Sequence, residues 1–209
     1  MKKIAKLHLL FTSKISFLNA FQRCQEGIDF KNQWVTIVLD GTEQQIYKPI
    51  DNENEKLVYS GKKKYHSLSK LIACSPKGRI YWISQSYEGS KTDASLYLLS
   101  ENWIHNKITN NEYIIADKAW QGWANERIIS PIKGKLNEKN KKYNNKLASI
   151  RIIVENVIEK IKEWKICKFT LRIKTSDLQN AFNFHDKVWT VCVGLHNLFH
   201  ANQRKNWEK

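Results

Sequence analysis

The sequence has few residues that would divide or cross-link it, with three prolines, eight glycines and four cysteines among 209 residues. Because there is no Pro/Gly-rich stretch and no internal repeat, no linker splits the chain into domains. The cysteines lie far apart and form no Cys-x-x-Cys pair, which argues against a zinc site and a disulfide framework. Reduced thiols are therefore predicted at Cys24, Cys74, Cys167 and Cys192.

Long hydrophobic runs are also missing. The longest, such as residues 34–39, fall far short of the roughly 20 residues that cross a bilayer. The start of the chain has a basic tip, but Lys6, His8 and Lys14 interrupt any continuous apolar region, and no small-x-small cleavage site follows. We therefore expect a protein that is neither exported nor inserted in a membrane.

Negative charge is scarce relative to positive charge. The chain has 35 Lys+Arg against 20 Asp+Glu, a formal net charge of +15. It is not a disordered polycation, because 42% hydrophobic residues are enough to bury a core. Such a surplus most often serves a polyanion, since each Lys or Arg set against a phosphate releases counterions. Nucleic acid is the expected partner, with anionic membrane a distant second.

Short apolar segments typical of strands are followed by segments with helical periodicity. This order predicts a mixed α/β fold. The turn Ser75-Pro76-Lys77-Gly78 predicts a β-hairpin, and the run at residues 34–39 predicts a central strand that stops at Asp40-Gly41. The predicted strands are residues 34–39, 65–74, 79–86, 113–116 and 128–132.

Apolar residues at steps of three or four predict two amphipathic helices, over residues 145–164 and from a Thr175-Ser176-Asp177 cap to Phe199. Shorter helices are predicted before about residue 25 and over residues 94–100. Residues 133–146 hold six lysines and one glutamate, and predict a solvated, mobile basic segment.

Three carboxylates are candidates for a metal site. Asp40 and Asp117 stand where predicted strands end, and Glu155 lies in the first long helix. Ligand sites form at strand ends in open α/β sheets, and a cation offsets the desolvation of a carboxylate there. Three converging carboxylates would hold Mg²⁺, and two ions about 4 Å apart can promote cleavage of a phosphodiester. The alternative is that Asp40 begins a turn, Asp117 begins the next loop, and Glu155 is a solvated helix residue.

The helix carries two cations near Glu155. Arg151 lies four residues before it and Lys162 seven after, so at about 100° per residue both fall within about 40° of Glu155. One interpretation sets Glu155 on a metal and the two cations on DNA phosphates. The other is a solvated Arg–Glu pair that contributes a few tenths of a kcal/mol.

Six sequence blocks carry a resemblance to a known family: VLDGTEQ (38–44), YSGKKKYHSLSK (59–70), GS-x-x-D (89–93), IIADKAWQGW (114–123), RIIVENVIEKIK (151–162) and GLHNL (194–198). In this order they resemble the catalytic domain of DDE transposases, of the bacterial insertion-sequence type called IS-five and its Harbinger-like relatives. The resemblance implies an RNase H-like fold, a mixed five-stranded sheet flanked by helices, over residues 31–209. Residues 1–30 would be a short helical N-terminal remnant.

The resemblance also implies site residues. Asp40, Asp117 and Glu155 match the three catalytic acids, which would bind two Mg²⁺ ions, with Mn²⁺ as a substitute. Arg151 and Lys162 match the arginine and lysine of the family's Y-R-E-K signature, and would contact DNA.

Some positions differ from the family's pattern. Asp93 is a rival second acid, but its spacing to Glu155 fits less well, and we interpret it as lining the site. The 39 residues before Asp40 leave little room for the helix-turn-helix region that such proteins generally carry, so we expect a truncated copy or end recognition supplied elsewhere. Three motif positions are changed without loss of an acid: Ala148 for tyrosine, Thr92 for histidine, and Ala119-Trp120 for Gly-Tyr.

Further candidates for DNA contact surround these acids. The cluster Lys62, Lys63 and Lys64 would suit the backbone of a bound strand, or is simply a solvated run. Trp123 follows the second acid closely enough to stack on a base; for Trp120, core packing is an equal alternative. His196 and His200 have metal-ligand spacing, but no third ligand accompanies them, so we assign no metal there.

The sequence thus predicts a Mg²⁺-dependent DDE transposase that cleaves double-stranded DNA at element ends and joins the ends to target DNA. We expect it in the cytoplasm, associated with the nucleoid, with no membrane partner and no small-molecule substrate; the prediction leaves room for a homodimer. The rival hypothesis is a truncated, catalytically inactive DNA-binding remnant that regulates transposition. A basic ribosome-associated protein is a third, which needs no acidic triad.

Overall fold

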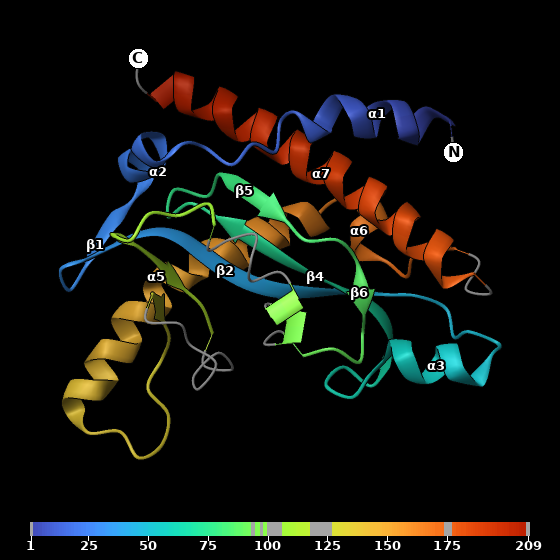
Figure 1. Cartoon of the computed structure of the whole chain (residues 1–209), viewed down its shortest axis with the longest axis horizontal. Helices are drawn as coiled ribbons and strands as arrows, with labels where there is room; N and C mark the ends of the chain where they lie inside the picture. Colours follow the sequence, from blue (N-terminus) through green and yellow to red (C-terminus); the bar gives the residue numbers. More distant parts are fainter. Residues whose placement is uncertain are drawn as a thin grey trace.

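The long strand β2 (Gln33–Gln45) lies at the centre of a mixed sheet (Figure 1). It pairs antiparallel with β4 (Tyr65–Cys74) on one edge and parallel with β7 (Glu112–Ile115) on the other. The computed structural model of the chain describes residues 2–92, 95–96, 98–99, 106–117, 127–173 and 177–207.

Eight strands of the described chain fill five positions across the sheet. Three short strands follow one another along the outer edge of β4, one pairs with the start of β2, and the last pairs parallel with β7. The predicted α/β class with a mixed, helix-flanked sheet is confirmed, although the strands number more than five. The short strands are β1 (Ile28–Phe30), β3 (Tyr59–Ser60), β5 (Ile80–Ile83), β6 (Tyr87–Glu88) and β8 (Ile128–Ile129).

Two long helices, α5 (Glu138–Lys162) and α7 (Leu178–Trp207), share a hydrophobic core with one face of the sheet. A third helix, α1 (Lys2–Thr12), lies along α7 (Figure 1). This contact is close because position 194 is glycine, where a Cβ would lie 2.6 Å from the Cβ of Phe11. The short helices are α2 (Ala20–Glu26), α3 (Asn52–Val58) and α6 (Lys165–Lys168).

The two faces of β2 belong to different hydrophobic clusters, because successive side chains of a strand point to opposite faces. Val38 packs with buried side chains of α5 and α7. Ile37 and Leu39 join the cluster on the other face. Asp40 follows Val38 by two residues, so it lies on the face that α5 covers.

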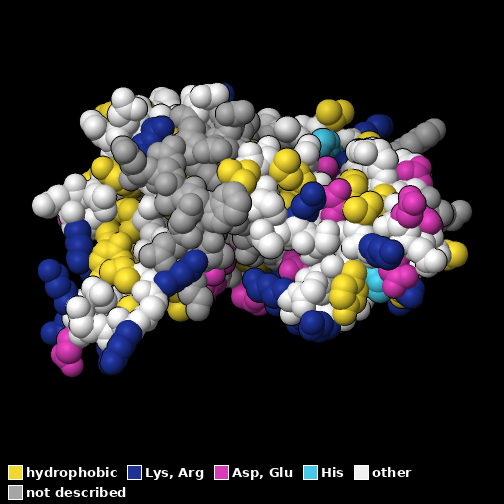
Figure 2. All heavy atoms as spheres, turned by 60° about the horizontal axis from the view of Figure 1, so that its bottom comes forward, with side chains coloured by type: hydrophobic (Ala, Val, Ile, Leu, Met, Phe, Trp, Pro, Cys, Tyr) yellow, Lys and Arg dark blue, Asp and Glu magenta, His cyan; other side chains and the backbone are white. Residues whose placement is uncertain are grey.

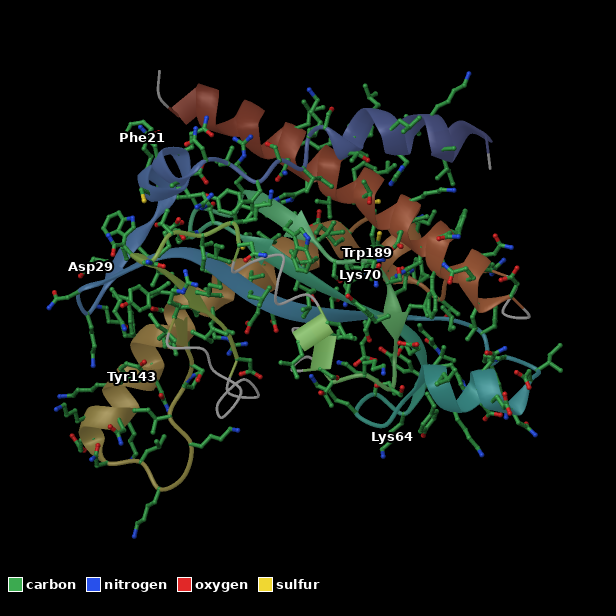
Figure 3. The ribbon with its side chains drawn as sticks, in the orientation of Figure 1. Phe21, Asp29, Lys64, Lys70, Tyr143 and Trp189 are labelled. Carbon is green, nitrogen blue, oxygen red and sulfur yellow. The ribbon has the colours of Figure 1, made fainter. Side chains whose placement is uncertain are left out.

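Buried polar contacts fix α7 on the sheet. The ammonium of Lys70 in β4 pairs with Asp186 of α7 and donates to the carbonyl oxygen of Ser84 at 2.9 Å. The Nε1 of Trp189 donates to the Oε1 of Gln44 in β2 at 2.8 Å. Both side chains are labelled in Figure 3, Lys70 on β4 and Trp189 on α7. These contacts fix the angle at which α7 crosses the sheet.

Two expectations about element bounds were wrong. β2 does not stop at Asp40-Gly41 but continues to Gln45, because β4 supplies an antiparallel partner for every residue from position 38 to 45. The lysine-rich segment at residues 133–146 was expected to be mobile. However, α5 begins inside it, at Glu138 after the N-cap Asn137. Tyr143 anchors this part of α5 through an edge-to-face contact with Phe30 of β1, with ring centroids 5.4 Å apart.

Other expectations are confirmed. β4 and β5 form the hairpin around Ser75–Gly78, and Asp177 caps the start of α7 through the Asn180 N–H. All four cysteines are free, Cys24 half-buried and the others buried. Of the helix predicted over residues 94–100, positions 95, 96, 98 and 99 are helical, and the rest lie outside the described residues. Within the described chain, no helix combines the length and apolar character needed to span a bilayer.

Candidate active site

The structure brings Asp40 and Asp117 together at matching positions along two neighbouring parallel strands, β2 and β7. Val38 of β2 pairs with Ile115 of β7, and each aspartate follows its paired residue by two positions. Since side chains alternate along a strand, both carboxylates are directed to the α5 face. Their side chains are 18% and 30% exposed.

Helix α5 adds Glu155 to this pair. The helix is held on the sheet by a buried stripe that includes Leu147, Val154 and Ile161. Glu155 stands next to this stripe, with its side chain 49% exposed. Three residues that are distant in the sequence, Asp40, Asp117 and Glu155, thus form one group, which we call the acid cluster.

The guanidinium of Arg151 connects the acid cluster. Its NH1 lies 3.4 Å from Asp117 Oδ1, and its NH2 lies 3.2 Å from Glu155 Oε1 and 3.9 Å from Asp40 Oδ2. The side chain is 16% exposed, and its buried Nε–H has no hydrogen-bond partner among the described residues. The predicted Arg151–Glu155 pair is present, but it is part of a four-residue cluster and not an isolated pair on the surface.

A cavity of about 190 Å³ opens beside the acid cluster. Its walls come from β2, from the turn between β3 and β4, and from the outer face of α5. Figure 2 shows Lys and Arg side chains gathered at the β3–β4 turn next to acidic side chains. The lining residues are Asp40, Gly41, Thr42, Glu43, Lys62, Lys63, Glu155, Ile158, Glu159 and Lys162. The cavity therefore combines carboxylates with three ammonium groups.

Lys162 is the most enclosed of these ammonium groups. Burial lowers the pKa of Lys162, and the neighbouring Lys63 lowers it further, against the opposing effects of Glu159 and Glu43. Desolvation disfavours the charged form of an amine. An anion that enters the cavity would favour the charged form again. Lys64 does not line the cavity and adopts a left-handed backbone conformation, with φ of 62°.

The acid cluster offers only oxygen donors, which is the ligand chemistry that Mg²⁺ prefers. Among the described residues, no group of three His, Cys, Asp or Glu side chains is arranged to hold a metal ion. The guanidinium of Arg151 lies between the carboxylates and so separates them. The residue types fit a magnesium site, and Arg151 accounts for their present spacing.

Five other residues were singled out from the sequence: Asp93, Trp120, Trp123, His196 and His200. Asp93, Trp120 and Trp123 lie outside the described residues. The ring of His196 contacts the carbonyl oxygen of Gly78 at 3.2 Å, in the loop before β5. The side chain of His200 is not among those described.

Sequence reasoning missed two carboxylates of the cavity. Glu159 lies one helical turn after Glu155, so the spacing that selected Arg151 could have selected it too. Glu43 accepts a hydrogen bond from the Ser67 hydroxyl at 2.7 Å. It was hidden because β2 was expected to end at Asp40, before Glu43 is reached.

The GLHNL block has a structural role. Gly194 admits α1, and Asn197 binds the backbone of the edge strand β5. The Asn197 Oδ1 accepts from Ile80 N–H at 2.9 Å, and its Nδ2 donates to the Ile80 carbonyl at 2.8 Å. These contacts satisfy backbone groups at the end of the hairpin.

Comparison with known proteins gives one result. The family model described as DDE superfamily endonuclease matches residues 39–197, about three quarters of the chain. Neither the curated proteins nor the solved structures gave a match. The matched range begins one residue before Asp40 and ends at Asn197, so it includes the whole acid cluster. The chain therefore belongs to the DDE superfamily of endonucleases.

Proposed function

We propose that the protein is a metal-dependent DDE transposase, which cleaves DNA strands at insertion-sequence ends and transfers them to target DNA. The observation that carries this proposal is the meeting of Asp40, Asp117 and Glu155, from three separate elements, around one positive charge. The cluster stands beside a cavity lined by lysines, in a chain of an endonuclease family.

The sheet supports an RNase H-like fold, as the resemblance implies. Across the sheet, β5 and β4 are antiparallel, β4 and β2 are antiparallel, and β7 and β8 run parallel to β2. Asp40 stands on β2, and Asp117 comes just after the parallel strand β7. Glu155 stands on α5, the helix that covers both strands. Rigid elements of this kind hold catalytic groups more accurately than loops do.

Asp40, Asp117 and Glu155 would hold two Mg²⁺ ions, with Mn²⁺ as a substitute. When bound, such ions favour deprotonation of the attacking oxygen and stabilise the leaving oxygen of a phosphodiester. In the first reaction, a water oxygen bonds to phosphorus as the P–O3′ bond breaks, which leaves a 3′-OH and a 5′-phosphate. In the second, the oxygen of that 3′-OH bonds to a phosphorus of the target DNA as the P–O3′ bond there breaks, and the displaced target 3′ oxygen takes the proton as a new 3′-OH.

The chain's own task is to position charge around the scissile phosphate. Lys62, Lys63 and Lys162 surround the cavity and would bind the phosphates of the reacting strand. The exposed lysines at the start of α5 and in the loop before it project from the molecule (Figure 2) and would bind flanking DNA. Lys64, Trp123 and Arg151 remain predicted DNA contacts.

The proposal is tested by strand cleavage of labelled duplex DNA that carries inverted repeats, with Mg²⁺, Mn²⁺ or EDTA. Glu155→Gln removes one carboxylate of the acid cluster at nearly constant volume. Glu53→Gln makes the same change at an exposed position of α3 and is the control. We expect metal-dependent cleavage by the wild type and Glu53→Gln, reduced at least about a hundredfold in Glu155→Gln. Undiminished cleavage by Glu155→Gln would refute the proposal.

A further inference from the structure

Arg151 is shared among three carboxylates and is well placed for none of them. Its contacts with the acid cluster span 3.2 to 3.9 Å, and only the contact with Glu155 has hydrogen-bond geometry. Charge-assisted hydrogen bonds of guanidinium groups are shorter, about 2.7–2.9 Å. No carboxylate of the acid cluster accepts two parallel N–H hydrogen bonds from Arg151, the arrangement in which arginine binds carboxylates best.

The acid cluster places three carboxylates around one guanidinium. Arg151 and the two aspartates are largely buried. A divalent ion carries twice the charge of a guanidinium and binds oxygen ligands at about 2.0–2.1 Å. The acid cluster therefore suits a smaller and more highly charged cation than a guanidinium.

Arg151 can leave without rearrangement of the backbone. The buried stripe of α5 fixes the helix, and with it the backbone of both Arg151 and Glu155. The arginine side chain is long and rotates about its own bonds, and two of its three partners, Asp40 and Glu155, line the adjoining cavity. A rotation would free the carboxylates while the strands that carry the aspartates stay in place.

We propose that Arg151 is an internal counterion of the acid cluster: it holds the three carboxylates together before a divalent cation binds, and it competes with that cation for them. This inference rests on the proposed function and adds to it a positioning residue that must yield before the metal site forms. The released guanidinium would be available to a DNA phosphate, the role that the sequence motif predicts for it.

Two variants test this competition. Arg151→Gln removes the charge, and Arg151→Lys keeps the charge but loses the planar fork of donors. Arg172→Gln, at an exposed position after α6, is the control. Binding of Mn²⁺ without DNA is measured by isothermal titration calorimetry. The melting temperature is measured in EDTA and in saturating Mn²⁺.

We expect Arg151→Gln to bind Mn²⁺ roughly two- to fivefold more tightly than the wild type, the factor that one lost competing ion pair gives. In EDTA its melting temperature should fall by about 2–4 °C, because the carboxylates then repel one another. Mn²⁺ should raise its melting temperature by more than it raises that of the wild type. Arg151→Lys should have an intermediate Mn²⁺ affinity, and Arg172→Gln should match the wild type.

Equal or weaker Mn²⁺ binding by folded Arg151→Gln would overturn the inference, while metal binding by the wild type would leave the proposed function standing. If Arg151→Gln does not fold, Arg151→Lys decides: unchanged or weaker Mn²⁺ binding by this variant overturns the inference. If the wild type binds no Mn²⁺, the proposed function and the inference fail together.

Discussion

Asp40 and Asp117 stand at matching positions of two adjacent parallel strands, each two residues beyond the paired Val38 and Ile115. Their proximity is therefore a consequence of strand register. A slip of one residue between β2 and β7 would turn one aspartate to the opposite face and dismantle the acid cluster. Whatever fixes the start of β7 also fixes the site.

The start of β7 is fixed by a buried ion pair. Glu112 is paired with Arg23 of α2 and accepts hydrogen bonds from the Thr36 hydroxyl of β2 and the Thr109 N–H, at 2.7 and 2.9 Å. Glu112→Gln would leave the Arg23 charge buried and without its partner. We expect the free energy of unfolding, measured in urea, to fall by about 3–5 kcal/mol. The exposed change Glu53→Gln should stay within about 0.5 kcal/mol of the wild type.

The same carboxylate predicts a loss of stability in acid. Burial alone would raise the pKa of Glu112, but hydrogen bonds from Arg23, Thr109 and Thr36 outweigh it and hold the pKa below its usual 4.5. Stability contributed by a carboxyl of lowered pKa is fully present above the unfolded value and is lost as pH falls through the folded value. Urea midpoints from about pH 7 to about pH 3 should therefore converge between wild type and Glu112→Gln. A constant difference down to the lowest pH would contradict this assignment.

Lys162 should bind a DNA phosphate. Lys162→Met should lower the slope of log affinity against log salt by about 0.9, the value of one phosphate contact on duplex DNA. The pKa of Lys162 is lowered by burial, and a phosphate would raise it again. Wild-type affinity should therefore fall as pH rises through the lowered pKa, and Lys162→Met should lack this component.

Fluorescence anisotropy with a labelled duplex measures both effects. Lys56→Met, at an exposed position of α3, removes one charge that does not line the cavity and is the control. An identical salt slope and pH profile in Lys162→Met and Lys56→Met would remove Lys162 from the DNA-binding surface.

The contact between α1 and α7 depends on Gly194. A methyl group there would meet the side chain of Phe11, so Gly194→Ala should destabilise the protein by about 1–3 kcal/mol. Hydrogen exchange of the α1 amides should accelerate more than exchange in the sheet. Gly61→Ala, where a Cβ would meet nothing within 4 Å, is the control and should not destabilise the fold. Unchanged exchange in α1 would show that the helix does not depend on this close approach.

Much of the scaffold was predictable because it follows from local patterns. The hairpin at Ser75–Gly78, the strand before Asp117 and the apolar stripe of α5 all carry period and turn signals in the sequence. The continuation of β2 beyond Asp40 had no such signal. There the residues are polar, and pairing with β4 maintains the strand.

The acid cluster was predicted residue by residue, but its internal arrangement was not. Helical spacing alone predicted a contact between Arg151 and Glu155. That the same guanidinium reaches Asp40 and Asp117 depends on how α5 crosses the sheet, which buried contacts distant in the sequence determine. The pairing of Lys70 with Asp186 is of the same kind, and a lone lysine within an apolar strand gives no sign of its partner.

The most direct test of the central claim is the cleavage of labelled duplex DNA by Asp117→Asn, compared with Asp29→Asn. Both variants replace a carboxylate by an amide. Asp29 is exposed on β1 (Figure 3), and Asp117 belongs to the acid cluster. We expect Mg²⁺- or Mn²⁺-dependent nicking by the wild type and Asp29→Asn, no nicking in EDTA, and none by Asp117→Asn. Tight DNA binding with no cleavage under any metal, or equal cleavage by Asp117→Asn, would contradict a catalytic role for the acid cluster. The first of these results would favour the regulatory DNA-binding remnant.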